Sequence, residues 1–128
     1  METELRAALL AWLRADPALA ALNCAAEEAP VAASLPWLGI AASASADWSA
    51  KGVTGREIRV ALELHCRGDD PATAGALVRA VEARVEALPR AQDGFAIATT
   101  LFLRARAEQR ANNTRAVLLE YRFRALAT

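Results

Sequence analysis

Apolar and charged residues alternate with a period of two over residues 56–67, the longest such run in the chain. The apolar positions of this run are Ile58, Val60, Leu62, Leu64 and Cys66. The charged or polar positions of the other parity are Glu57, Arg59, Glu63, His65 and Arg67. Successive side chains of a strand point to opposite faces, so the run predicts a strand with one buried and one solvated face. The charged parity is a candidate outer contact face.

Three further segments are predicted strands, at about residues 36–45, 94–104 and 114–126. The strand at 94–104 is expected to place alternate residues on one face: Phe95, Ile97, Thr99, Leu101 and Leu103. Between the last two strands lies the arginine-rich segment RARAEQRANN, which predicts the tip of a long hairpin. Its Asn112 and Asn113 suit a left-handed turn, because asparagine tolerates positive φ.

Two stretches have helical spacing, residues 3–22 and 71–88. In the first, apolar residues recur on one helix face through Arg14, with Thr3 as the expected N-cap. Asp16 and Pro17 then predict a short second helix, since proline suits the first helical turn. The second stretch follows Asp70 and ends before Pro89. Its apolar stripe consists of Ala74, Leu77, Val78, Val81, Val85 and Leu88.

This order of elements predicts an α+β fold, with a largely antiparallel four-stranded sheet and helices packed on one face. A chain of 128 residues is expected to form one domain over residues 1–128. No apolar run approaches the roughly 20 residues that span a bilayer. The acidic N-terminus also lacks the basic start of a signal peptide. We therefore expect a cytoplasmic protein with no membrane partner.

Charge is balanced overall but uneven along the chain. Fifteen basic and 15 acidic residues cancel, so no global field points to nucleic acid or to an anionic membrane. Residues 1–30 are mainly acidic, whereas residues 104–124 are mainly basic. Ordinary scatter explains this asymmetry as readily as a surface that docks head to tail with copies of the same chain.

The sequence contains few residues that could form a catalytic or metal-binding site. His65 and Cys66 are adjacent in a strand, so they point to opposite faces and cannot form a nucleophile–base pair or a shared metal site. The acidic pairs at 27–28 and 69–70 lack a partner that would divide acid and base roles, and they are interpreted as structural. Cys24 and Cys66 suit two reduced thiols better than a disulfide. We expect no catalytic residue, no metal and no cofactor.

Three segments together carry a family resemblance. They are ELRAALLAWLRADPALAALN at the N-terminus, LPWLGIAASASADWSAKGVTGREIRVALELHCR in the middle and AVLLEYRFRAL near the C-terminus. In this order they resemble the small phage tail-completion proteins of the DUF3168 type, relatives of the tail terminators of long-tailed phages and phage-like gene transfer agents. One departure is the segment 23–30, which replaces a short segment of the family and argues against an extra edge strand there.

The resemblance implies a structural virion protein without catalysis. Such proteins form a ring, usually hexameric, that caps the head-proximal end of the tail tube, ends tube growth and joins the tail to the neck. The implied partners are other copies of the chain, the tail tube protein and a head-closure or neck protein. DNA would pass through the ring lumen without sequence-specific contacts. Assembly is expected in the bacterial cytoplasm, in the tail of a phage or gene transfer agent particle.

Two alternatives remain open: another head–tail connector such as a head-closure protein, or a small α+β ligand-binding or enzymatic domain. For the ring, long loops on a rigid sheet are the expected contact regions. One is the loop that contains Trp48 and Lys51. The other is the hairpin tip, whose candidate contacts are Arg104, Arg106, Arg110 and Arg115. A nucleic-acid patch at 104–115 is less suitable, because no aromatic residues are interleaved with these arginines.

Overall fold

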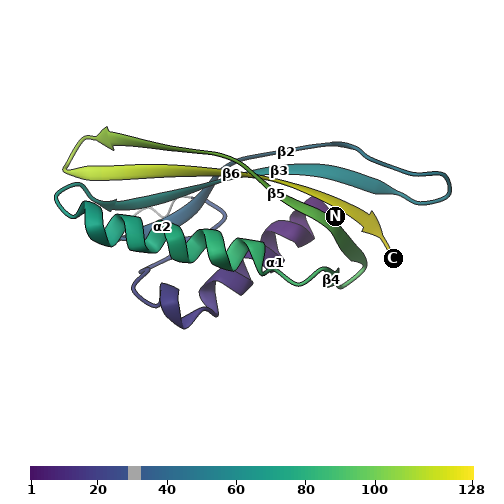
Figure 1. Ribbon diagram of the computed structural model, residues 1–128, viewed down its shortest axis with the longest axis horizontal. Helices are drawn as coiled ribbons and strands as arrows, with labels where there is room; N and C mark the ends of the chain where they lie inside the picture. Colours follow the sequence, from purple (N-terminus) through teal and green to yellow (C-terminus); the bar gives the residue numbers. More distant parts are fainter. Residues whose placement is uncertain (29–32) are drawn as a thin grey trace.

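Helices cover one face of a mixed β-sheet, and the opposite face is open (Figure 1). The computed structural model describes residues 1–28 and 33–128, and within them six strands form one sheet in the order β1-β2-β3-β6-β5-β4. The helical elements are α1 (Glu2–Arg14), the 3₁₀ helix η1 (Pro17–Leu19) and α2 (Pro71–Glu86). The strands are β1 (Ala25–Ala26), β2 (Trp37–Asp47), β3 (Gly55–Arg67), β4 (Ala91–Gln92), β5 (Phe95–Arg110) and β6 (Thr114–Ala127).

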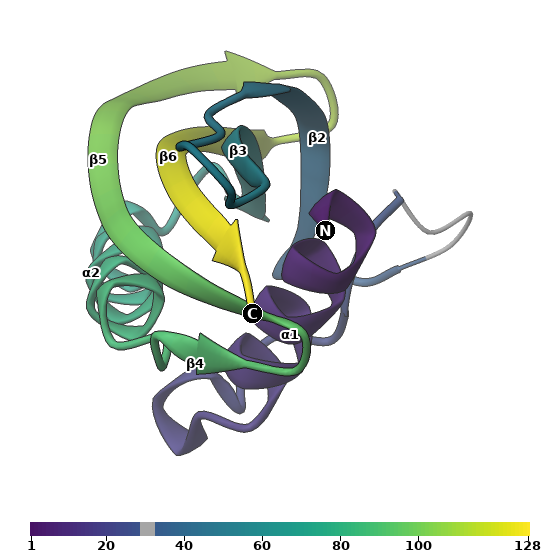
Figure 2. The ribbon, with the colours of Figure 1, turned by 90° about the vertical axis from the view of Figure 1, so that its right-hand side faces the viewer.

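The sheet is strongly curled, so that it forms a half-barrel when viewed from one end (Figure 2). Its four long strands, β2, β3, β6 and β5, are antiparallel to their neighbours. Register shifts interrupt the pairing between Ile40 and Ala42 in β2, and at two places in β5. Such bulges increase the local twist of a strand, which accounts for part of the curl.

The bulges in β5 overturn the simple alternation expected for that strand. Phe95 and Ile97 are buried beneath the sheet, as expected. The shift after Ile97 reverses the parity, so Thr99 and Leu101 lie on the face away from the helices. Phe102 lies on the helix side, with its ring edge-on to Tyr121 at a centroid distance of 5.6 Å. A period-two pattern cannot reveal where an extra residue shifts the register.

The core lies between the sheet and the two helices. The central strands β3 and β6 bury one full face each, and α1 adds Leu5, Leu9, Leu10 and Leu13. Burying a leucine side chain contributes about 1.5–3 kcal/mol, so these rows supply most of the driving force for folding. The buried members of the predicted α2 stripe are Ala74, Leu77, Val81 and Val85, with Leu88 just beyond the helix.

The predicted helix starts are confirmed in part. The Asp16 side chain accepts a hydrogen bond from the Ala18 backbone N–H at 3.0 Å, as expected for the cap of η1. Asp70 caps α2 in the same way, through the Thr73 N–H at 3.2 Å. The expectation for Thr3 was wrong, because α1 begins one residue earlier and has no side-chain cap.

The four predicted strands are present, but a four-stranded sheet was wrong because two short strands extend it to six within the described residues. β1 lies in the segment where an extra edge strand was not expected, although residues 29 and 30 of that segment lie outside the described residues. It pairs parallel with Leu38 and Gly39 of β2. β4 pairs with the start of β5. Two-residue strands carry no periodic signal, so the pattern could not predict them.

Candidate functional site

The sheet face turned away from the helices, here called the outer face, gathers most of the charged residues singled out in the sequence. The cross-strand register shows that these residues share a face, since Arg59 of β3 is opposite Arg122 of β6, which is opposite Leu101 of β5. The charged members of the outer face are Glu57, Arg59, Glu63, Arg67, Arg104, Arg106, Glu108, Arg110, Glu120, Arg122 and Arg124. Residues more than 40 positions apart in sequence thus form one surface.

Arg110 of β5 reaches across β6 to β3. Its guanidinium donates two hydrogen bonds to the Glu63 carboxylate, at 2.8 and 3.1 Å, and a third to Glu108 at 2.7 Å. These contacts raise the pKa of Arg110, chiefly through Glu63. The hydrogen bond from Arg110 also lowers the pKa of the Glu108 carboxyl. The guanidinium is therefore held in one orientation on the surface.

The other predicted contact arginines of β5 are oriented in the same way. Arg104 makes a two-point contact with Glu120, at 3.0 and 3.2 Å, and Arg106 donates to Glu108 at 3.2 Å. Exposed pairs of this kind contribute little to stability, so their main effect is to align the side chains. A partner surface can exchange these weak pairs for its own.

His65 differs from the expectation that it lies on a solvated face. It lies on the outer face but is 9% exposed, because the Trp37 ring covers it at a centroid distance of 3.9 Å and an interplanar angle of 9°. Its Nε2 lies 2.9 Å from the Glu63 carboxylate. Burial lowers the pKa of His65, Glu63 opposes this and Arg110 adds to it. The imidazole is therefore stacked against the Trp37 ring and is not an exposed contact residue.

The pKa of His65 predicts a pH dependence of stability. Below about pH 6.5, the ordinary pKa of histidine, the unfolded chain binds a proton that the folded chain does not yet bind. The free energy of unfolding should therefore fall as the pH falls from 6.5 to the lower folded pKa. His65→Phe keeps a ring against Trp37 but cannot titrate, so its urea-unfolding free energy should vary less between about pH 7.5 and 5.5. His65 is the single histidine of the chain, so an equal slope in both proteins would contradict the assignment.

The loop between β2 and β3 lies at the end of the molecule where this hairpin extends beyond the helices (Figure 1). Trp48 and Lys51 belong to this loop, which spans residues 48–54. Trp48 is half-buried, and the Arg124 guanidinium carbon lies 5.5 Å from its ring centroid. Arg124 in turn donates to Glu57 at 3.1 Å. Gly55 is required at the base of this loop, since a Cβ there would lie 2.3 Å from the Trp48 carbonyl oxygen. Lys51 is exposed in the loop itself.

Arg115 does not join the other predicted contacts. It is paired with Cys66 in the register of β3 and β6, and Cys66 belongs to the buried parity. The side chain is half-buried on the helix side of the sheet. Arg67 lies near the same end, where it pairs with Asp69 at 3.2 Å.

Several residues of the outer face were missed in the sequence. Glu120 was detectable, because counting outwards from a three-residue turn centred on Asn112 places it opposite Arg104. The positive φ expected at the turn is confirmed, with 61° at Asn112 and 53° at Asn113. The predicted extent of the hairpin tip was wrong, because residues 104–110 continue strand β5 and only residues 111–113 form the turn. The position of Trp37 over His65 could not be predicted from the sequence, since this contact depends on the pairing of β2 with β3.

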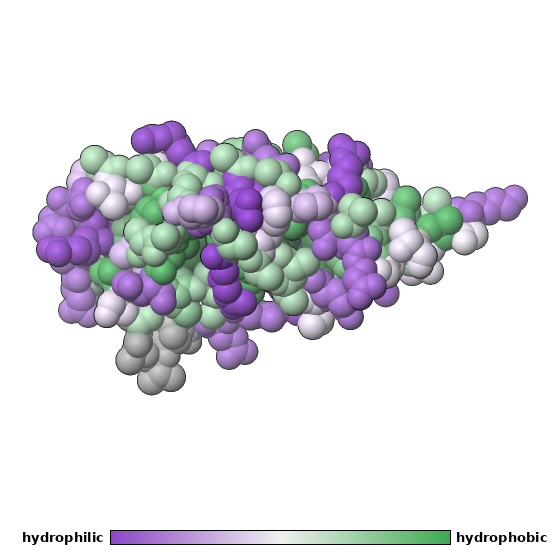
Figure 3. Space-filling model, turned by 90° about the horizontal axis from the view of Figure 1, so that it is seen from below, coloured by the Kyte–Doolittle hydropathy of each residue, from purple (hydrophilic) through white to green (hydrophobic). Residues whose placement is uncertain are grey.

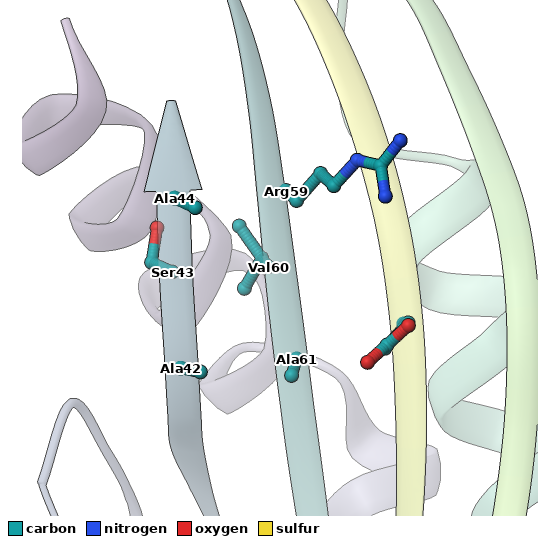
Figure 4. A pocket seen from close by; sticks show the side chains of 7 residues that line it. Ala42, Ser43, Ala44, Arg59, Val60 and Ala61 are labelled. Atoms are coloured by element: carbon teal, nitrogen blue, oxygen red, sulfur yellow. The ribbon is translucent and has the colours of Figure 1, made fainter. Parts of the chain in front are cut away.

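A shallow hollow of about 210 Å³ lies on the outer face between β2, β3 and β6. Its floor is formed by small side chains, Ala42 and Ala44 of β2 and Ala61 of β3, with Arg59 extending across from β3 towards β6 (Figure 4). Glu120 borders the other side. The residues that line the hollow provide small and charged side chains, but they include no nucleophile–base pair.

Over residues 1–28 and 33–128, no three His, Cys, Asp or Glu side chains are grouped so that they could hold a metal ion. In the same part of the chain, no helix has the length and apolar character needed to cross a membrane. On the helix side, hydrophilic and hydrophobic residues are interspersed, and the molecule tapers towards one end (Figure 3).

Comparison with known proteins identifies a family and a similar solved structure. The family model for "Tail completion protein gp17" matches residues 7–126. Among solved structures, a chain from the virion of a native gene transfer agent particle is similar, with 25% sequence identity and a TM-score of 0.84. The match covers 98% of this chain and 96% of that chain. No curated protein matches the sequence.

Proposed function

The chain belongs to the tail completion protein gp17 family, and from that premise we propose that it forms a ring capping the head-proximal end of a phage-like tail tube. In this role it ends tube growth and joins the tail to the neck. It acts as a structural component of a virion or gene transfer agent particle and not as an enzyme. Its partners are further copies of itself, the tail tube protein and the neck.

The observation that carries this proposal is the extent of the two matches. The family model spans residues 7–126, and the likeness to the gene transfer agent chain spans 98% of the protein. At a TM-score of 0.84 the similarity includes the curled sheet as well as the helices. The fold as a whole, and not one motif within it, therefore supports a role in the particle.

The outer face supports a protein-binding role within that particle. Arg104, Arg106 and Arg110 are held in place by carboxylates of the same face, at N–O distances of 2.7–3.2 Å. Aligned charges of both signs favour specific docking, because a partner must match their positions. These charged groups include no pair with separate general-acid and general-base roles, which catalysis requires.

The proposal is tested by deleting the gene for this chain from a particle-producing strain. Particles should then carry tails of uncontrolled length, or heads should lack tails, and a wild-type copy supplied in trans should restore normal particles. Electron microscopy of negatively stained particles measures the tail lengths. Tails of normal length that fail to join heads would instead indicate a head-closure protein. Normal particles that still infect or transfer DNA would contradict both roles.

A further inference from the structure

The sheet has two open edges. β1 covers β2 at Leu38 and Gly39, and β4 covers β5 at Phe95 and Ala96. Elsewhere on these edges, residues 42–47 of β2 pair only with β3 and residues 98–110 of β5 pair only with β6, so within residues 1–28 and 33–128 no second strand covers their outward side. Each edge therefore presents backbone N–H and C=O groups that a further strand could pair with.

The open edge of β2 carries a bulge after Ile40 and a contact from Arg6 of α1 to Ser43, but few of the other features that protect an edge strand. Residues 41–46 read AASASA, with no proline, lysine or other charged side chain before Asp47. All of these residues are exposed. Natural sheets protect such edges with charges, prolines or covering segments, since an exposed flat edge recruits other strands. A partner strand is the physical explanation for an edge of this kind.

We propose that neighbouring copies of the chain join edge to edge, with residues 43–46 of β2 in one copy paired antiparallel with residues 99–102 of β5 in the next. This inference rests on the proposed ring. The two edges differ, so the contact is heterologous and each copy can bind one neighbour on either side, as ring closure requires.

The strand directions are compatible with such a ring. β2 and β5 run in opposite directions within one sheet, because three antiparallel pairings separate them. Rotation about a ring axis preserves the direction of a strand that lies along that axis. β2 of one copy and β5 of the next are therefore antiparallel, and the curled sheets would continue around the ring.

The side chains on the two edges are complementary in shape. Leu101 and Phe102 of β5 are 44% and 41% exposed, which is unusual for large apolar residues beside an open edge. Leu101 shares the outer face with Ala44, because the register joins Ala44, Arg59, Arg122 and Leu101 in one row. In the next copy, Leu101 would thus lie over the small floor of the 210 Å³ hollow.

The charges on the two edges are also complementary. With Leu101 beside Ala44, the antiparallel alignment brings Arg104 and Arg106 towards the start of β2. At that level the chain leaves β1 into Glu27, which pairs with Arg6 of its own chain, and Glu28, and both carboxylates are exposed. Basic residues of one copy therefore meet acidic residues of the next, consistent with the uneven charge along the sequence.

Cysteine pairs in assembled particles test this contact. One variant carries Ala44→Cys with Leu101→Cys, and a second carries Ala42→Cys with Leu101→Cys, so that two alignments of the strands are sampled. Both variants also carry Cys24→Ser, which removes the half-buried native thiol. After mild oxidation, non-reducing gels of purified particles should show a ladder of covalent multimers for at least one pair. The control, Ala76→Cys with Leu101→Cys, places one thiol on the exposed side of α2 and should remain monomeric.

The outcomes separate the contact from the proposed function. Particles with normal tails that contain the variants but give no ladder for either pair would overturn the edge contact and leave the terminator role intact. A ladder equally strong in the control would also overturn the contact, since the linkage would then be non-specific. Absence of the chain from purified wild-type particles would contradict the terminator role, and the edge contact with it.

Discussion

Leu119→Ala is expected to lower the free energy of unfolding by about 2–5 kcal/mol. Leu119 is fully buried in β6, opposite Leu62 of β3, which is also fully buried. Removing its side chain leaves a cavity between the central strands and the helices, and the flanking strands are too constrained to fill it. Urea unfolding followed by circular dichroism measures the change.

The adjacent Leu118 provides a matched control. It has the same side chain in the same strand, but it lies on the outer face beside Glu63 and is only half-buried. Leu118→Ala should therefore cost less than about 1.5 kcal/mol, because part of its surface is already in water. Equal losses for the two variants would contradict the assignment of the two sheet faces.

Reversing the charges of the β5 arginines, by Arg104→Glu, Arg106→Glu and Arg110→Glu, should lower incorporation into particles by about tenfold or more. Like charges across an interface cost several kcal/mol, and each 1.4 kcal/mol is a factor of ten in binding. Quantitative blotting of purified particles measures incorporation. The thermal midpoint of the free protein reports separately on folding, since Arg110 and Arg104 also hold Glu63 and Glu120.

A charge swap separates docking from internal pairing. Arg104→Glu combined with Glu120→Arg keeps the internal ion pair but exchanges the positions of the two charges. If Arg104 contacts a partner, the swap should keep the thermal midpoint near that of the wild type and still reduce incorporation. Unchanged incorporation of the triple reversal at low salt, where surface electrostatics are strongest, would rule out a contact role for these arginines.

The sequence predicted the elements that have a strong and regular pattern. β3 and α2 were recognised because their periods of 2 and 3.6 residues extend over 13 and 16 residues. The turn at Asn112–Asn113 was recognised because few residue types adopt positive φ. In contrast, the curl of the sheet depends on bulges, and a bulge shifts the register without changing residue type.

The sequence predicted which charged residues lie on the outer face, but not the contacts between them. The charged residues of β3 and the β5 arginines were identified, whereas their mutual contacts depend on β6 lying between those strands. His65 is covered because β2 brings Trp37 beside it, a contact between residues 28 positions apart. The hollow over Ala42, Ala44 and Ala61 exists because two strands place small residues side by side. Such features depend on strand pairing, which a single sequence does not specify.

The most direct test of the terminator role is an electron cryo-microscopy map of purified particles. Into this map the curled sheet with α1 and α2 can be fitted without adjustment. The proposed function predicts a closed ring of copies where the tail tube meets the neck, and the proposed edge contact predicts β2 of each copy beside β5 of the next. Density for this fold along the tube, at the distal tip of the tail, or nowhere in the particle would contradict that role.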